Sequence, residues 1–371
     1  MTVGRPLKVV IIDDQPVIRQ AIVGLLHGEA DFQIVGQAGD GEEGLKVVFA
    51  TQPDVITLDL EMPRLDGFAF LRLLMAKQPR PVVIVSSHAT RESVFRALEL
   101  GAVEFVAKPS RISSQSDLAP VREDLLRKLR TVTRLSIRSI AERMRLQGQG
   151  VRLRTRSSED LLAGIRIPTE PSTTQIPRYV VCIGASTGGP PAIATLLQAL
   201  EPKLPISVLI TQHMPHKFTA AFVDRLRRTT MWPVSEASPE LPVVSGEVLV
   251  APASHSLCVY RDGNQLRILP PGQVSEPAAG YVPSIDRMFA AAAEAMGKSV
   301  VGVILSGMSG DGVEGVRAVY KAGGRVLVES PQSAVMPSMP EEAIATGAVR
   351  DVGPLPRLAS LIIRQVLSRP M

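Results

Sequence analysis

The sequence predicts an α/β protein with two domains, each a doubly wound parallel sheet. Its 371 residues exceed the usual size of one domain. Short apolar runs alternate with stretches of helical period, which is typical of repeated strand–helix units and a parallel sheet. A polar stretch with Gly, Ser, Thr and Pro interrupts this alternation at 147–177, where we expect a flexible linker.

The first half of the chain contains five apolar runs that we expect to be strands. These runs are residues 7–13, 33–38, 54–60, 81–87 and 103–109. Helices are expected at 16–27, 41–50, 67–77 and 90–101, and one long basic helix at 121–146. Ligands bind outside the carboxyl ends of parallel strands, so residues that follow these runs are candidates for a site.

Polar side chains stand at four of these strand ends. The first strand ends in Asp13 and Asp14, the third in Asp59, the fourth in Ser86 and the fifth in Lys108. Three carboxylates this close repel one another unless a cation lies among them, and an oxygen-only ligand set suits Mg²⁺. The Lys108 ammonium can pair with an aspartate or with a phosphoryl group on it. Each residue alone fits a strand end or a helix cap, but all five in this order indicate a functional site.

Residues 5–125 resemble the receiver domain of two-component response regulators, which has a flavodoxin-like fold. The segments IIDDQP, LDLEMPRLDG, VSS and AKPS carry the resemblance, in that order. It implies that Asp59 accepts a phosphoryl group from a phosphohistidine or a small phosphodonor. The implied Mg²⁺ ligands are Asp13, Asp14, Asp59 and the backbone carbonyl of Glu61. Ser86 and Lys108 would contact the phosphoryl group, and Phe105 would be the switch aromatic.

The second half predicts another parallel sheet. The expected strands are 178–186, 205–213, 246–252, 299–308 and 325–330, with helices at 191–200, 218–229, 284–297 and 313–324. Residues 256–269 predict two short strands joined by a hairpin at Asp262, Gly263 and Asn264. We therefore expect domains at 1–125 and 177–371, joined by a basic helical extension and linker at 126–176.

A serine between glycines marks the first strand-to-helix turn of this second half. The segment Gly184 to Gly188 reads GASTG and fits the G-x-S-x-G pattern of nucleophilic serines. A turn serine without chemistry is the alternative. A dinucleotide-binding loop is disfavoured, because the second glycine of G-x-G-x-x-G is missing.

Two further strand ends supply partners for Ser186. His213 ends the next strand, and Asp311 lies in a glycine-rich turn after a later one. A serine nucleophile needs a base, and the base needs an orienting acid, so the three residues predict a hydrolytic triad. Their chain order, serine then histidine then acid, differs from that of the common α/β-hydrolases.

Residues 178–369 resemble the catalytic domain of chemotaxis-type protein-glutamate methylesterases, a Rossmann-like α/β domain. The segments CIGASTGGP, ITQHMPHKFTAAFVDRL, LVAPASH, VPSIDRMF and LSGMSGDGVEGV carry this resemblance. It implies Ser186 as nucleophile, His213 as general base and Asp311 as orienting acid. The backbone N–H of Met308 would join the oxyanion hole, and Thr187 would neighbour the nucleophile. Two departures from the family pattern are Ser309 and Ser338, which stand where glycines are usual.

The two resemblances together imply a function in a chemosensory two-component pathway. The chain would hydrolyse glutamyl methyl esters of chemoreceptors, releasing methanol, and deamidate receptor glutamines, which provides adaptation. Phosphorylation of Asp59 by a chemotaxis-type histidine kinase would activate it. Mg²⁺ would serve the receiver only, and ester hydrolysis would need no cofactor. Two alternatives stay open: a second domain that binds a partner without hydrolysis, and a transcriptional regulator that uses its basic segment on DNA.

Charge and apolar content limit which partners and which compartment are expected for this chain. The net charge is +5, and residues 122–156 hold 11 Lys/Arg against 3 Asp/Glu. This segment lacks interleaved aromatic residues, which favours a solvated helix over a nucleic-acid site. No apolar run approaches the about 20 residues of a membrane span, and no secretory signal is recognisable. We expect a cytoplasmic monomer that binds no nucleic acid, with Cys182 and Cys258 as core residues.

Overall fold

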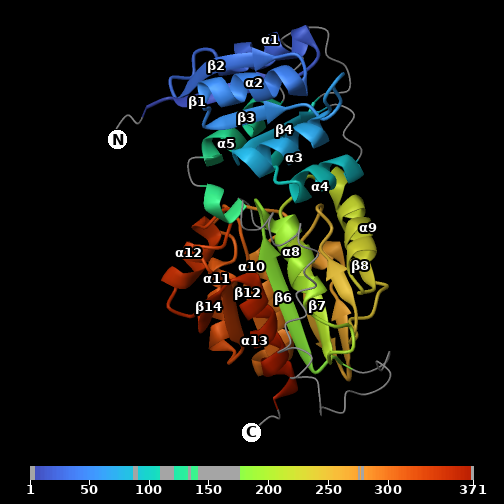
Figure 1. The fold of residues 1–371 in the computed structure, drawn as a ribbon. Coiled ribbons are helices and arrows are strands. Elements are labelled where there is room, and N and C mark those ends of the chain that lie inside the picture. Colours follow the sequence, from blue (N-terminus) through green and yellow to red (C-terminus); the bar gives the residue numbers. More distant parts are fainter. Residues whose placement is uncertain are drawn as a thin grey trace. The chain divides into compact units, whose positions relative to one another are not determined.

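The computed structural model describes residues 5–86, 91–108, 121–132, 135–140, 176–274, 276 and 280–368 (Figure 1). Its internal contacts divide the chain into two compact units, Met1–Gly148 and Gln149–Met371. Each unit is described by itself below. The domain boundaries expected at residues 125 and 177 stay a prediction.

The first unit is built on a five-stranded parallel sheet with the strand order β2-β1-β3-β4-β5. The strands are β1 (Leu7–Ile12), β2 (Phe32–Ala38), β3 (Val55–Leu58), β4 (Val82–Ser86) and β5 (Glu104–Ala107). The helices are α1 (Pro16–Leu26), α2 (Gly41–Thr51), α3 (Gly67–Lys77), α4 (Arg91–Glu99) and α5 (Arg122–Thr131). This is the flavodoxin-like order, whose switch point lies between β1 and β3. The predicted elements of this unit are confirmed up to α4.

Helix α5 is shorter than the sequence predicted. It ends at Thr131, and the chain is not helical at residues 135 and 136 before a helical turn at 137–140. The run Thr131-Val132-Thr133 consists of β-branched residues, which lose side-chain freedom in a helix and lower its stability there. A single helix over 121–146 was therefore wrong, and residues 141–146 lie outside the described part of the chain.

The second unit contains a seven-stranded parallel sheet with the order β14-β13-β12-β6-β7-β9-β8. Its strands are β6 (Tyr179–Ala185), β7 (Ile206–Gln212), β8 (Val234–Glu236), β9 (Val248–Val250), β12 (Val300–Ile304), β13 (Arg325–Glu329) and β14 (Asp351–Gly353). Strands β8 and β14, of three residues each, were not predicted. A separate antiparallel hairpin pairs β10 (Val259–Asp262) with β11 (Gln265–Ile268), as the sequence predicted.

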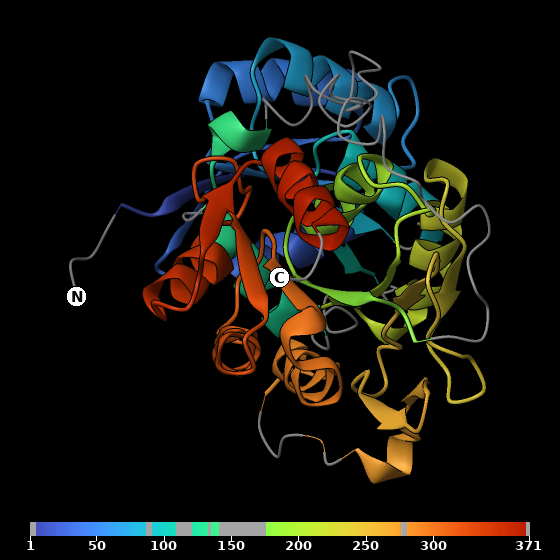
Figure 2. The same cartoon turned by 90° about the horizontal axis from the view of Figure 1, so that it is seen from below.

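Helices cover both faces of the seven-stranded sheet. They are α8 (Gly189–Gln198), α9 (Thr219–Thr229), α10 (Ile285–Met296), α11 (Val313–Lys321), α12 (Ser338–Ala345) and α13 (Leu355–Leu367). Figure 2 looks along the strands and shows α8 and α13 on one face, with α10 and α11 on the other. The predicted doubly wound architecture is therefore confirmed for both units.

No described helix combines the length and the apolar character that a membrane span requires.

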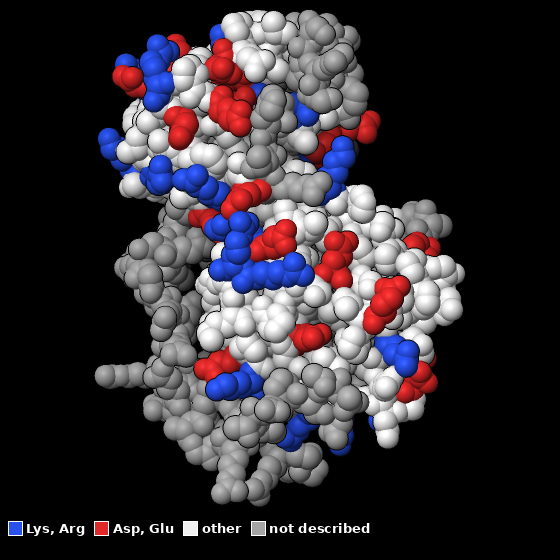
Figure 3. Space-filling model, turned by 90° about the vertical axis from the view of Figure 1, so that its right-hand side faces the viewer, with Lys and Arg blue, Asp and Glu red and all other residues white. Residues whose placement is uncertain are grey.

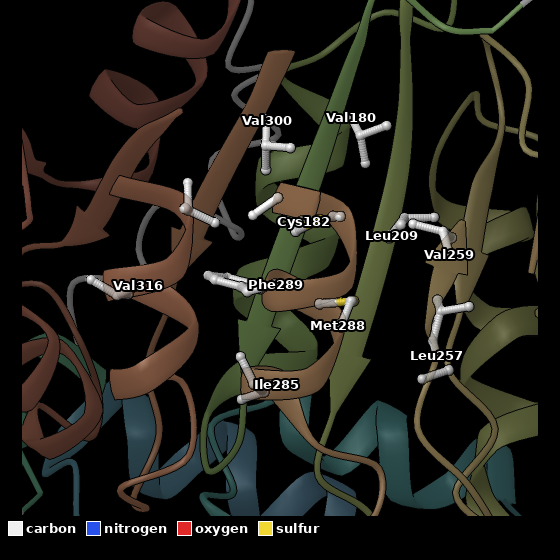
Figure 4. Packing of buried hydrophobic residues seen from close by; sticks show 14 of the residues in the cluster. Val180, Cys182, Leu209, Leu257, Val259, Ile285, Met288, Phe289, Val300 and Val316 are labelled. Atoms are coloured by element: carbon white, nitrogen blue, oxygen red, sulfur yellow. The ribbon is translucent and has the colours of Figure 1, made fainter. Parts of the chain in front are cut away.

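Glycines let α10 approach the sheet closely. A Cβ atom on Gly184 of β6 would lie 2.5 Å from Cγ2 of Ile285, and one on Gly302 of β12 would lie 2.9 Å from Cε2 of Phe289. Ile285 and Phe289 are fully buried, and Figure 4 shows both on α10 against the strands of the sheet. The helix thus fits into space that side chains on these two strands would fill.

The two cysteines are core residues, as predicted. Cys182 on β6 and Cys258 before β10 are both buried and free. Burial raises the pKa of the Cys182 thiol far above its ordinary value and raises that of Cys258 to about 11. Both thiols therefore stay protonated at neutral pH and pack as small apolar groups.

We predict that Gly184→Ala lowers the free energy of unfolding by about 1–3 kcal/mol, because the added methyl group collides with buried Ile285. Thermal unfolding of the full chain would measure the loss. Gly272→Ala is the matched control, because no described atom lies within 4 Å of the Cβ position there. Equal melting temperatures for the two variants would contradict the close packing of α10.

Candidate functional site

In the second sheet, successive strands are added in opposite directions on the two sides of the β6–β12 pair. The chain runs from β6 to β7 on one side, and from β12 to β13 on the other. Ligands of open α/β sheets bind outside the carboxyl ends of the strands at such a point. Ser186 follows β6, His213 follows β7, and the turn that holds Asp311 follows β12. All three residues therefore stand at the edge of the sheet where a ligand is expected.

Backbone contacts hold the Ser186 turn in place. The Ser186 N–H donates to the carbonyl of Ser306 at 3.1 Å, and its carbonyl accepts from the Gly189 N–H at 2.8 Å. Nε2 of Gln212 donates to the same carbonyl at 2.9 Å. A Cβ on Gly307 would lie 2.9 Å from the Cβ of Ser186. The turn after β12 thus touches the serine directly, and only a glycine fits at the point of contact.

His213 and Asp311 form a buried pair. Nε2 of the imidazole lies 2.8 Å from Oδ2 of Asp311, and the two side chains are 9% and 7% exposed. The His213 N–H also donates to the carbonyl of Ala185 at 3.0 Å, which places the histidine beside the start of the serine turn. Nδ1 of the imidazole is buried and has no hydrogen-bond partner within the described structure.

This arrangement fixes the tautomer of the neutral imidazole. A hydrogen bond to a carboxylate requires the proton on Nε2, so Nδ1 carries the lone pair. Nδ1 is therefore the nitrogen of His213 that can accept a proton.

Asp311 is held as an anion by the start of α10. Its carboxylate accepts from Ser284 Oγ at 3.0 Å and from the N–H groups of Ile285 at 2.7 Å and Asp286 at 3.0 Å. Burial acts to raise the pKa of Asp311, but the hydrogen bonds from His213, Asp286 and Ile285 outweigh it and lower the pKa. The helix N-terminus adds further stabilisation of the negative charge. A charged carboxylate thus faces the imidazole at neutral pH.

Asp286 makes the reciprocal contact. Its Oδ1 accepts from the N–H groups of Gly312 at 2.9 Å and Gly315 at 2.6 Å, at the start of α11. Burial raises the pKa of Asp286, with a further contribution from the charge of Asp311. Asp311 therefore caps α10, which contains Asp286, and Asp286 caps α11, which follows Asp311, so the Asp311 turn is tied to α10. The sequence analysis gave Asp286 and Ser284 no role, although a serine before an apolar helical run signals an N-cap.

The other predicted residues of this site lie in the same two turns. Thr187 is buried, and its carbonyl accepts from Ser306 Oγ at 2.8 Å. Met308 follows Gly307, the residue that touches Ser186. Ser309 is buried, and its Oγ finds no hydrogen-bond partner among the described atoms. Ser338, the second departure from the family pattern, donates through Oγ to the carbonyl of Gly307 at 3.2 Å, so it braces the turn beside Ser186.

The first sheet brings its predicted acidic residues together. One ligand oxygen from each of Asp13, Asp14 and Asp59 lies within 4.8 Å of the others. Lys108 Nζ donates to Asp13 Oδ2 at 2.6 Å and pairs with Asp59. Burial raises the pKa of Asp13 to about 6 despite the neighbouring ammonium. Asp14 Oδ1 is buried, with no hydrogen-bond partner in the described structure. Asp14 thus has a buried oxygen without a partner, and burial disfavours the charged form of Asp13. Both features fit a bound cation with oxygen ligands.

Ser86 and Phe105 lie on the neighbouring strands. Ser86 is buried at the end of β4, and its carbonyl accepts from the Lys108 N–H at 3.0 Å. Phe105 on β5 is also buried, and the Lys128 ammonium lies 5.0 Å from the centre of its ring. Glu61 donates its N–H to Asp59 Oδ1 at 3.4 Å, and the metal-binding role of its carbonyl stays a prediction.

The described part of the basic segment is paired with acidic residues of its own unit. Arg122 contacts Glu29, Arg130 lies 2.6 Å from Asp31, and Lys128 lies 2.8 Å from Asp124. On the face shown in Figure 3, Lys and Arg are interspersed with Asp and Glu. Along its described length this segment therefore offers less free positive charge than its composition suggests.

The folds and their strand-end residues define a response-regulator receiver domain joined to an α/β domain of hydrolytic type. The family model for the response regulator receiver domain matches residues 9–117, and that for CheB methylesterase matches residues 181–362. A protein-glutamate methylesterase/protein-glutamine glutaminase of Geobacter sulfurreducens is 42% identical over 368 residues, covering 97% of this chain and 98% of the relative. One of Myxococcus xanthus is 41% identical, with 97% and 98% covered.

The chain therefore belongs to the protein-glutamate methylesterase/protein-glutamine glutaminase family. Among solved structures, the crystal structure of the Thermotoga maritima CheB methylesterase catalytic domain is 30% identical, with a TM-score of 0.46, and covers 51% of this chain and 98% of that one. Both family resemblances found in the sequence are confirmed.

We predict that Asp286→Ala lowers the free energy of unfolding by about 2–4 kcal/mol, because two buried N–H groups lose their acceptor. Asp286→Asn keeps an acceptor oxygen and should lose less. Denaturant unfolding of the full chain would measure both, with Glu294→Ala, an exposed position on the same helix, as the control. If the alanine and asparagine variants were equally stable, the capping role of Asp286 would be wrong.

Asp311 should also make stability depend on pH. Its pKa is lower in the folded chain than in the unfolded chain, where it is about 4. The unfolded chain therefore binds more protons in acid, and the stabilisation is complete above the unfolded pKa and lost as pH falls through the folded pKa. We expect the melting temperatures of wild type and Asp311→Asn to differ by the full amount above about pH 5 and to begin to converge as the pH falls below about 4. A difference that stays constant down to pH 3 would refute this.

Proposed function

We propose that this chain is a phosphorylation-activated esterase and glutaminase that acts on glutamyl methyl esters and glutamines of chemoreceptors. The observation that carries the proposal is the buried His213–Asp311 pair, whose free Nδ1 lies at the same sheet edge as Ser186. The names of the curated relatives supply the reaction class. A domain that only binds a partner would not need a water-shielded imidazole with an oriented lone pair.

The chemistry follows from these groups. His213 Nδ1 takes the proton of Ser186 Oγ as the oxygen attacks the carbonyl carbon of the substrate. The imidazolium that forms is stabilised by Asp311, whose low pKa keeps it ionised. The same proton then passes to the leaving group, which departs as methanol from an ester or as ammonia from an amide. Water hydrolyses the acyl-enzyme by the same route in reverse.

The negative charge on the substrate oxygen needs donors. We assign the backbone N–H of Met308 to this oxyanion hole, with Thr187 beside the nucleophile. The assignment is supported by the contact between Gly307 and Ser186, which brings the turn after β12 against the serine. Fixed backbone donors of this kind stabilise the transition state without reorganisation.

In the first unit, Asp59 is the proposed phosphoacceptor. Asp13, Asp14 and Asp59 are the residues that would hold Mg²⁺, which when bound neutralises charge on the transferring phosphoryl group. Lys108 and Ser86 would contact the phosphoryl oxygens. Lys108 is already fixed against Asp13 and Asp59, so phosphorylation replaces one anionic partner of this ammonium by another. The proposed donor is a chemotaxis-type histidine kinase.

Methanol release from membranes that carry methylated chemoreceptors tests the proposal. The full chain would be assayed with and without Mg²⁺ and acetyl phosphate. We expect the phosphodonor to raise the rate only when Mg²⁺ is present. Ser186→Ala should lower the rate by about 10³-fold or more, and Asp59→Ala should keep the basal rate but lose the stimulation.

Each result bears on a different part of the proposal. Methanol release that survives Ser186→Ala would overturn the nucleophile assignment. Stimulation that survives Asp59→Ala would overturn the phosphoacceptor assignment. If wild type released no methanol, labelling of Ser186 by a fluorophosphonate would separate a different ester or amide substrate from an inactive triad.

A further inference from the structure

The ring of Tyr281 lies flat on the imidazole of His213. The two ring centroids are 4.4 Å apart, and the planes differ by 7°. Tyr281 is 41% exposed, whereas the His213 side chain is 9% exposed. A tyrosine at the surface therefore forms the cover of a buried imidazole. The sequence analysis gave Tyr281 no role.

The hydrogen bond to Asp311 leaves one motion of the imidazole unrestrained. It fixes the position of Nε2, but the ring plane can still turn, because the torsion between Cβ and an aromatic ring has a broad energy minimum. Such a turn would change the direction of the Nδ1 lone pair, which has to face the Ser186 hydroxyl when the proton is transferred. A parallel ring at stacking distance restrains this motion, since tilting the imidazole would bring it into collision with the phenol ring. The nitrogen lone pairs lie in the ring plane, so a ring stacked on one face does not obstruct proton transfer from Ser186 to Nδ1, while it covers the imidazole toward the surface.

The stack also bears on access of water to Nδ1. This atom is buried and lacks a hydrogen-bond partner in the described structure, although it lies beside a surface residue. A water molecule bound to Nδ1 would compete with the serine hydroxyl for its lone pair. The electron-rich face of the phenol ring further favours the imidazolium that forms as the serine attacks, by a cation–π interaction. All three effects act on the transition state through His213.

We propose that Tyr281 is the positioning residue of the general base: it holds the plane of the His213 imidazole and shields Nδ1 from water. The inference rests on the proposed function for its effect on rate. It does not need Tyr281 to touch the substrate. The aromatic ring carries the effect, and the hydroxyl group does not.

Three variants of the full chain test this: Tyr281→Phe, Tyr281→Leu and Tyr281→Met. The first keeps the ring, and the other two replace it by apolar side chains without a flat face. With Mg²⁺ and acetyl phosphate present, we expect Leu and Met to lower kcat of methanol release by about 10- to 100-fold, since misplacing a catalytic group by about 1 Å has an effect of this size. KM should change by less than about twofold, and Phe should retain the wild-type kcat.

A second readout does not depend on turnover. Diethyl pyrocarbonate modifies unprotonated imidazole nitrogens, and peptide mass spectrometry can follow His213 separately from the other histidines. We expect faster modification of His213 in the Leu and Met variants than in wild type or Phe. Tyr320→Leu, at a 48% exposed tyrosine on α11, is the matched control and should change neither readout.

The outcomes separate the inference from the proposed function. The inference would be overturned if the Leu and Met variants kept both the wild-type kcat and the wild-type rate of His213 modification. A rise in KM alone would also overturn it and make Tyr281 a substrate contact. If wild type itself released no methanol and Ser186 took no fluorophosphonate label, the proposed function would fail, while the modification of His213 would still decide whether Tyr281 shields it. Two replacements of different shape guard against a variant that does not fold.

Discussion

The carboxylate of Asp311 is the group on which the second unit depends most. It accepts hydrogen bonds from His213, from Ser284 and from two N–H groups at the start of α10. One side chain thus caps a helix and orients the proposed general base. The N–H groups of the helix start need an acceptor whether or not a reaction takes place. The proposed acid is therefore positioned by a requirement of the fold, and its negative charge is stabilised before any substrate binds.

This arrangement requires α10 to lie close to β6 and β12. Gly184 and Gly302 provide the space, and Ile285 and Phe289 fill it. Asp286, in the first turn of the same helix, then fixes the turn that carries Asp311. Core packing and site geometry are consequently coupled. A methyl group added under α10 would move the helix start and, with it, the donors that hold the carboxylate in front of the imidazole.

The buried carboxylates of the two proposed sites, Asp311 and Asp13, are stabilised to different degrees. Asp311 has enough donors to stay ionised, so its pKa is lowered. Asp13 has the Lys108 ammonium but is so deeply buried that its pKa rises to about 6. A carboxylate in that condition gains from a further positive charge, which Mg²⁺ would supply. Hydrogen-bond donors therefore stabilise the charge of Asp311, whereas the Asp13 carboxylate would be stabilised further by a cation.

The sequence by itself determined both fold classes and the strand ends that carry Asp13, Asp59, Lys108, Ser186 and His213, because period and turn residues are local and parallel strands bring their carboxyl ends to one edge. It also carried the family resemblance. Only the tertiary structure decided which imidazole nitrogen is free, that Asp311 caps α10 while Asp286 caps α11, and that Tyr281 covers His213. These contacts join residues far apart in the chain, so no local pattern contains them. The end of α5 at Thr131 was missed for a different reason, since the local run of β-branched residues was present but was outweighed by the periodic leucines and isoleucines.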